Sequence, residues 1–60
     1  MLDRKLEIKL ERERTGVTMK EIADYMKVSE TTVRRWIDDH NSEKIDQILA
    51  TIKEVESLKS

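Results

Sequence analysis

The stretch from Thr18 to Ile37 constrains the fold of this 60-residue chain more than any other part of it. It holds two short runs in which apolar residues recur at helical spacing, and a helix start signal precedes each run. Thr18 followed three residues later by Glu21 is a capping box, in which the hydroxyl and the carboxylate bind free backbone N–H groups. Ser29 can cap the second run. The pattern predicts two capped helices joined by a tight turn.

Each predicted helix has one apolar side. Val28 lies in the turn and can pack beneath both helices, and the small Ala23 allows them to approach closely. This arrangement is a helix-turn-helix. The apolar residues at helical spacing are Ile22, Ala23 and Met26 in the first helix and Val33, Trp36 and Ile37 in the second.

The run IADYMKVSETTVRRW resembles the DNA-binding helix-turn-helix of phage repressors and Cro-like proteins. In that family the turn position matched by Lys27 usually holds glycine. A left-handed backbone there costs a non-glycine residue about 1 kcal/mol. The resemblance also implies that Arg12 pairs with an acid just after the recognition helix, where this chain has Ile37 followed by Asp38. The matching residues of the motif are Ile22, Ala23, Met26, Val28, Val33 and Trp36.

The whole chain is predicted to be one all-α domain, a small bundle of four helices that contains the helix-turn-helix. By the resemblance, it is a shortened form of the lambda-repressor-like fold. In the first helix Leu2, Leu6 and Leu10 share one face and Ile8 lies on another, so we expect this helix to contact two partners. Gly16 ends it in the left-handed conformation. The predicted helices cover about residues 2–14, 19–26, 30–38 and 43–58 of a domain spanning 1–60.

Composition excludes several classes of function. The chain has no Cys, so neither a disulfide nor a thiolate metal site is possible, and its single His40 lies in a polar loop. Without a Gly-rich phosphate loop or a Cys/His cluster, we expect no enzyme activity, metal, cofactor or small-molecule substrate. The charged start lacks a long apolar run, which predicts a cytoplasmic protein without a membrane segment.

The formal net charge of −1 is low for a protein that binds nucleic acid, but its distribution is uneven. Residues 1–37 carry a net charge of +2 and residues 38–60 a net charge of −3. The positive charge therefore lies with the helix-turn-helix, and the acidic half can face away from a duplex.

The outward face of the second motif helix has the side chains that a recognition helix presents to the major groove. Arg can bind guanine O6 and N7, Thr can contact a base or a thymine methyl, and Glu can accept from cytosine N4. Asp38 is expected to pair with Arg34 or Arg35. The predicted base contacts are Glu30, Thr31, Arg34 and Arg35, and the predicted phosphate contacts are Thr18, Lys20, Lys27, Ser29 and Thr32.

The resemblance implies a phage or mobile-element regulator, a Cro-like repressor that binds double-stranded DNA at a palindromic operator as a homodimer. The apolar stripe of the last helix extends past the expected core, so Ile52, Val55 and Leu58 are predicted to contribute to the dimer interface. Two alternatives stay open. One is a protein–protein adaptor or antirepressor that uses the acidic last helix, and the other is a detached recombinase-type DNA-binding domain.

Overall fold

The computed structural model describes residues 3–59 of the chain, which form four helices and no strand. The all-α fold with a helix-turn-helix is confirmed, and the second and third helices have the predicted bounds. The predicted helix start at Leu2 lies outside the described residues. Asp3 caps the first helix, because its carboxylate accepts from the backbone N–H of Lys5 at 3.0 Å. The helices are α1 (Arg4–Thr15), α2 (Met19–Met26), α3 (Glu30–Asp38) and α4 (Ser42–Lys59).

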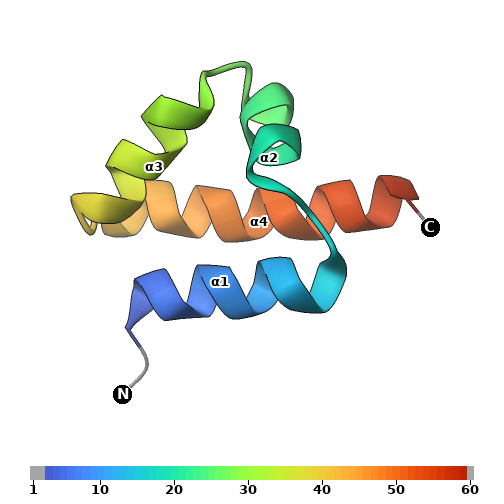
Figure 1. Cartoon of the computed structure of the whole chain (residues 1–60), viewed down its shortest axis with the longest axis horizontal. Coiled ribbons are helices and arrows are strands. Elements are labelled where there is room, and N and C mark those ends of the chain that lie inside the picture. Colours follow the sequence, from blue (N-terminus) through green and yellow to red (C-terminus); the bar gives the residue numbers. More distant parts are fainter. Residues whose placement is uncertain (1–2, 60) are drawn as a thin grey trace.

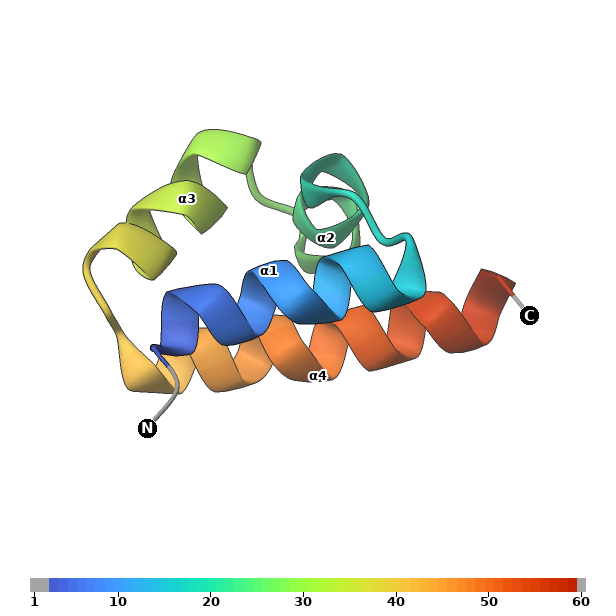
Figure 2. The ribbon, with the colours of Figure 1, turned by 60° about the horizontal axis from the view of Figure 1, so that its bottom comes forward.

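Helices α1 and α4 lie side by side and run in the same direction, with α2 and α3 packed across them (Figure 1, Figure 2). Two ion pairs connect the parallel helices. Arg4 pairs with Asp46, and the Arg14 Nη2 atom lies 3.5 Å from Glu56 Oε2. Both pairs join residues 42 positions apart, so the two helices keep one register over their length.

Every helix, together with the link between α1 and α2, contributes to a single apolar core. Because this core is small, no helix can bury its apolar face without the others. Its buried side chains are Ile8, Val17, Ile22, Ala23, Val33, Ile37, Ile45, Ile48, Ile52 and Val55, and the side chains packed against it are Met19, Met26, Val28, Trp36 and Leu49.

The position of α1 shows which of its two apolar faces packs within the chain. Ile8 is buried, whereas Leu6 and Leu10 are almost half exposed. A second partner of α1, if it exists, would therefore contact the exposed face that carries Leu6 and Leu10. Leu2, which was predicted to share that face, lies outside the described residues.

The prediction for the dimer surface is corrected at two of its three positions. Ile52 is fully buried and Val55 is 7% exposed, so both belong to the core of one chain. They cannot reach a second copy unless that core opens. Leu58 is 75% exposed, and its role in a dimer stays a prediction. The stripe on α4 is long because α1, α2 and α3 all pack against it.

The local signals around the helix-turn-helix are confirmed. Thr18 Oγ1 accepts from the Glu21 N–H at 3.2 Å, and Glu21 Oε1 accepts from the Thr18 N–H at 3.0 Å, which completes the capping box. Ser29 Oγ accepts from the N–H of Thr32 at 3.2 Å and caps α3. Lys27 ends α2 in the left-handed conformation, with φ 60° and ψ 42°.

The two remaining helix ends follow the same logic. Gly16 takes the left-handed conformation after α1, with φ 75°, as predicted. The Asn41 side chain accepts from the N–H of Lys44 at 3.2 Å and so caps α4. None of the four helices in residues 3–59 has both the length and the apolar character needed to cross a membrane.

Candidate nucleic-acid interface

Helix α3 has a sharply divided surface. Val33 is fully buried and Ile37 is 5% exposed, and together they anchor the helix to the core. Trp36 is partly buried at the edge of that core, where the Lys44 ammonium lies 4.9 Å from its ring centroid. The core therefore fixes which side of α3 faces outward. The four predicted base-contacting side chains, Glu30, Thr31, Arg34 and Arg35, are all exposed on that side.

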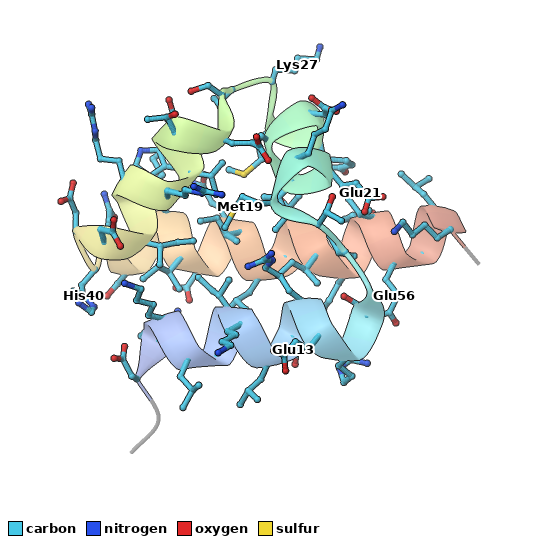
Figure 3. The ribbon with its side chains drawn as sticks, viewed as in Figure 1. Glu13, Met19, Glu21, Lys27, His40 and Glu56 are labelled. Atoms are coloured by element: carbon cyan, nitrogen blue, oxygen red, sulfur yellow. The ribbon has the colours of Figure 1, made fainter. Side chains whose placement is uncertain are left out.

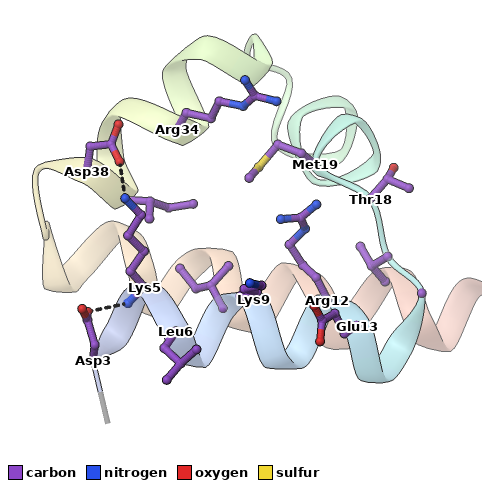
Figure 4. A pocket seen from close by; sticks show the side chains of 14 residues that line it. Asp3, Lys5, Leu6, Lys9, Arg12, Glu13, Thr18, Met19, Arg34 and Asp38 are labelled. Carbon is purple, nitrogen blue, oxygen red and sulfur yellow. Dashed lines mark hydrogen bonds and ion pairs between the residues drawn. The ribbon is translucent and has the colours of Figure 1, made fainter.

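The structure contradicts the predicted pairing of Asp38 with Arg34 or Arg35. Asp38 Oδ1 instead lies 3.1 Å from the Lys5 ammonium, and this ion pair connects the end of α3 to the start of α1 (Figure 4). Within residues 3–59, neither arginine has an ion-pair partner. Both guanidinium groups are therefore available to an external ligand.

Three of the predicted phosphate contacts lie in the turn or in the first turn of α3. Lys27 extends from the tip of the turn, away from the rest of the molecule (Figure 3). The hydroxyls of Ser29 and Thr32 lie 2.9 Å apart. Only one of them can donate in that hydrogen bond, so the other keeps a hydrogen for a phosphate oxygen.

The start of α2 is a mixed electrostatic site. Lys20 is exposed there, but the Thr18 hydroxyl lies 3.2 Å from Glu21 Oε1 and is already used within the capping box. The Lys59 ammonium, 2.8 Å from the same carboxylate oxygen, and the Thr18 N–H together lower the pKa of Glu21 below its usual value. Lys59 thus neutralises the carboxylate that would otherwise repel an anion at the positive end of this helix.

The basic side chains of the described residues divide into two groups by partner. One group is neutralised within the chain: Arg4, Lys5, Arg14 and Lys59 lie beside carboxylates. The second group has no carboxylate partner within residues 3–59, and all but its last two members lie in α1, α2, α3 or the turn. Its members are Lys9, Arg12, Lys20, Lys27, Arg34, Arg35, Lys44 and Lys53.

Part of this second group lines a groove that α1 forms with the start of α2 and with α3 (Figure 4). The groove has a volume of about 810 Å³, and Ile8, Val17 and Ile37 contribute to its walls. Its charged lining residues are Asp3, Lys5, Lys9, Arg12, Glu13, Arg34 and Asp38.

Arg12 rises from α1 into this groove (Figure 4). Its Nε atom is buried and has no hydrogen-bond partner among the described residues. A buried donor without a partner costs about 1–3 kcal/mol. The resemblance implied that Arg12 pairs with an acid, but Arg12 forms no ion pair within residues 3–59, and Asp38 pairs with Lys5.

None of the predicted DNA contacts lies in α1, although cations of this helix line the groove. A signal for them exists, since Lys5, Lys9 and Arg12 are spaced four and three residues apart and so share one helix face. The sequence alone does not show that this face lies opposite α3.

Comparison with known proteins adds one finding. The model of a family described as a homeodomain-like domain, a helix-turn-helix domain, matches residues 2–49. No curated protein and no solved structure matches the chain. The match confirms the helix-turn-helix prediction but does not extend to the Cro-like subtype, the phage origin, the repressor role or the dimer, which stay predictions.

Proposed function

Because the chain belongs to this homeodomain-like helix-turn-helix family, we propose that it is a sequence-specific regulator of transcription that binds double-stranded DNA. The observation that carries the proposal is the exposed face of α3. There Thr31, Arg34 and Arg35 are free of partners within the described residues, while Val33 and Ile37 hold the opposite face in the core. A rigid helix with an unpaired polar face suits insertion into the major groove.

The proposed contacts follow from the chemistry of each side chain. Arg34 and Arg35 can each bind guanine O6 and N7 through two parallel hydrogen bonds. Thr31 can meet a thymine methyl, and Glu30 at the start of the helix can accept from cytosine N4. Lys27 in the turn and the exposed Lys20 contact phosphates, which position α3 without contributing sequence preference.

We further propose that two copies bind a palindromic operator, with half-sites about 34 Å apart, and repress by covering promoter sequence. A dimer interface must use apolar side chains that the core leaves exposed. Of the three residues predicted for the dimer interface, Leu58 is the exposed one. Leu6 and Leu10 provide a second exposed apolar surface, on α1. The domain is proposed to act by binding, without catalysing a reaction on the DNA.

The acidic last helix gives little support to the adaptor alternative. Asp46 and Glu56 on α4 pair with arginines of α1, so part of its negative charge is used within the chain. A recombinase-type DNA-binding domain would use the same α3 face and differs from the proposal in its biological context rather than in its contacts.

The test is selection of binding sites from a pool of random duplexes, followed by anisotropy titration of the selected site. We expect a palindromic consensus. Arg34→Ala and Arg35→Ala should each cost about 1–3 kcal/mol and relax the preference at one base pair. The matched control is Lys53→Ala, which removes an exposed cation from α4. If no sequence is enriched and no duplex binds saturably at low salt, the proposal is refuted and the adaptor is favoured.

A further inference from the structure

We propose that α1 also takes part in DNA binding: Lys9 and Arg12 hold a phosphate of the DNA backbone in the groove that Arg34 lines from the opposite wall. This inference rests on the proposed function and extends it. It assigns a ligand to the groove and adds a second helix to the interface that α3 and the start of α2 form.

The position of the groove supports this assignment. Its lining includes Arg34 from the outward face of α3 and Thr18 at the start of α2. Arg34 is a predicted base contact, and Thr18 caps α2 next to the exposed Lys20, a predicted phosphate contact. A duplex that touches both must pass over the groove between them. The DNA strand nearest to the protein therefore runs past the side chains that α1 presents from the other wall.

The charges of the groove favour an anion, because its four cations outnumber its three acids, Asp3, Glu13 and Asp38. Arg12 and Arg34 line the same space, and neither has a carboxylate partner within residues 3–59. Lys9 is exposed on the same face of α1 and is likewise unpaired there. Three like charges around one space repel each other until an anion enters. Lys5, the fourth cation of the lining, is neutralised by Asp38 and adds little.

The chemistry of these groups favours a phosphate. A guanidinium group can donate two parallel hydrogen bonds to phosphate oxygens, and an ammonium group can act beside it as a point charge. Arg12 has a buried Nε donor still without an acceptor. The apolar part of the groove wall, which includes Ile8, Val17 and Ile37, excludes water from the far side of the ion. Such surroundings strengthen the attraction between the ion and the cations.

The experiment measures how the affinity for duplex DNA depends on salt. A labelled duplex of mixed sequence, about 20 base pairs long, is titrated with the full chain between about 50 and 200 mM salt. Each phosphate contact contributes about 0.9 to the slope of log K against log salt. Because Lys9 and Arg12 share one phosphate, Lys9→Gln and Arg12→Gln should each reduce the slope by up to about 0.9, the full contribution of that contact. At about 0.1 M salt, this corresponds to a roughly eightfold loss of affinity.

Three companion variants separate phosphate binding from structural effects. Arg12→Lys keeps the charge and should recover most of the slope. Glu13→Gln removes an acid from the groove lining and should raise the affinity. Lys53→Gln removes a cation from α4, which contributes no residue to the groove lining, and should leave the slope unchanged. A thermal melt of each variant checks that the chain is folded. Lys9 is exposed, so Lys9→Gln keeps the test valid even if Arg12→Gln unfolds.

The outcomes distinguish this inference from the function on which it rests. If the unmodified chain binds no duplex, the proposed function itself fails. If it binds, and Arg35→Ala weakens binding while Lys9→Gln and folded Arg12→Gln leave the slope unchanged, only the groove assignment is overturned. In that case Arg12 has a structural role. Because a phosphate contact carries no sequence information, the Lys9 and Arg12 variants should also lose affinity equally for selected and random duplexes.

Discussion

Replacing Lys27 with glycine should stabilise the fold and weaken its binding to DNA. Lys27 ends α2 with φ 60° and ψ 42°, a conformation in which a side chain crowds the backbone. Its own side chain is exposed and has no ion-pair partner among the described residues. The substitution therefore removes backbone strain and leaves the core unchanged.

Two opposing terms set the size of the effect. Relief of the left-handed conformation gains about 1–2 kcal/mol. The greater freedom of glycine in the unfolded chain costs about 0.5–1 kcal/mol. Taking the middle of each range, the net gain is about 0.75 kcal/mol, which for a domain of this size raises the melting temperature by about 3–6 °C.

The assay is a thermal melt followed by circular dichroism, with two matched controls. His40 has φ 53°, so His40→Gly should also stabilise, at a site outside the predicted DNA contacts. Lys53 lies inside α4, so Lys53→Gly should destabilise by about 1 kcal/mol. If Lys27→Gly and His40→Gly melt at or below the temperature of the unmodified chain, the argument from backbone strain is wrong. Asparagine also tolerates the left-handed conformation but carries no charge. The DNA affinity of Lys27→Asn therefore measures the proposed phosphate contact separately from the backbone strain.

Three further predictions concern stability. Thr18→Ala removes the capping hydroxyl and should cost about 1 kcal/mol in urea unfolding. The lowered pKa of Glu21 means that its contribution is present above the usual carboxyl pKa and is lost as the pH falls through the lower folded value. The stability difference between the unmodified chain and Glu21→Gln should accordingly shrink as the pH is lowered from about 7 to about 3, and an unchanged difference would exclude this linkage. Ile52→Ala should cost about 2–5 kcal/mol, whereas Leu58→Ala should stay within about 0.5 kcal/mol, because only Ile52 is buried.

The sequence predicted the helix-turn-helix well because its signals are local. The capping box of Thr18 and Glu21 sets the start of α2, and Ser29 sets the start of α3. Each signal acts over three residues and does not depend on the rest of the fold. The left-handed backbone at Lys27 was expected from the resemblance, because Lys27 matches the turn position at which that family usually has glycine.

The packing of α1 was harder to predict because this helix has two short apolar faces. Leu6 and Leu10 lie on one face and Ile8 on the other, and helical spacing alone does not show which face is buried. The decision depends on α4, which lies parallel to α1 and meets the Ile8 side. The same contact explains the error at Ile52 and Val55. Their stripe is long because α4 supports three helices rather than a second copy of the chain.

The ion pairs between helices could not be predicted either, since they join residues that only the tertiary fold brings together. Arg4 with Asp46, and Arg14 with Glu56, depend on the parallel register of α1 and α4. Asp38, assigned from local spacing to an arginine of its own helix, is held by Lys5 instead. These long-range pairs determine which cations stay available.

The low net charge of the chain therefore says little about its capacity to bind DNA. Acids of α4 neutralise basic side chains on α1, and the unpaired cations within the described residues remain mostly on the helix-turn-helix and in the adjoining groove. A phosphate interacts with the charges within about a Debye length, roughly 8–10 Å, rather than with the total over the chain. Adding positive charge far from this face, for example by Glu54→Lys on α4, should change duplex affinity less than removing a single cation such as Lys9.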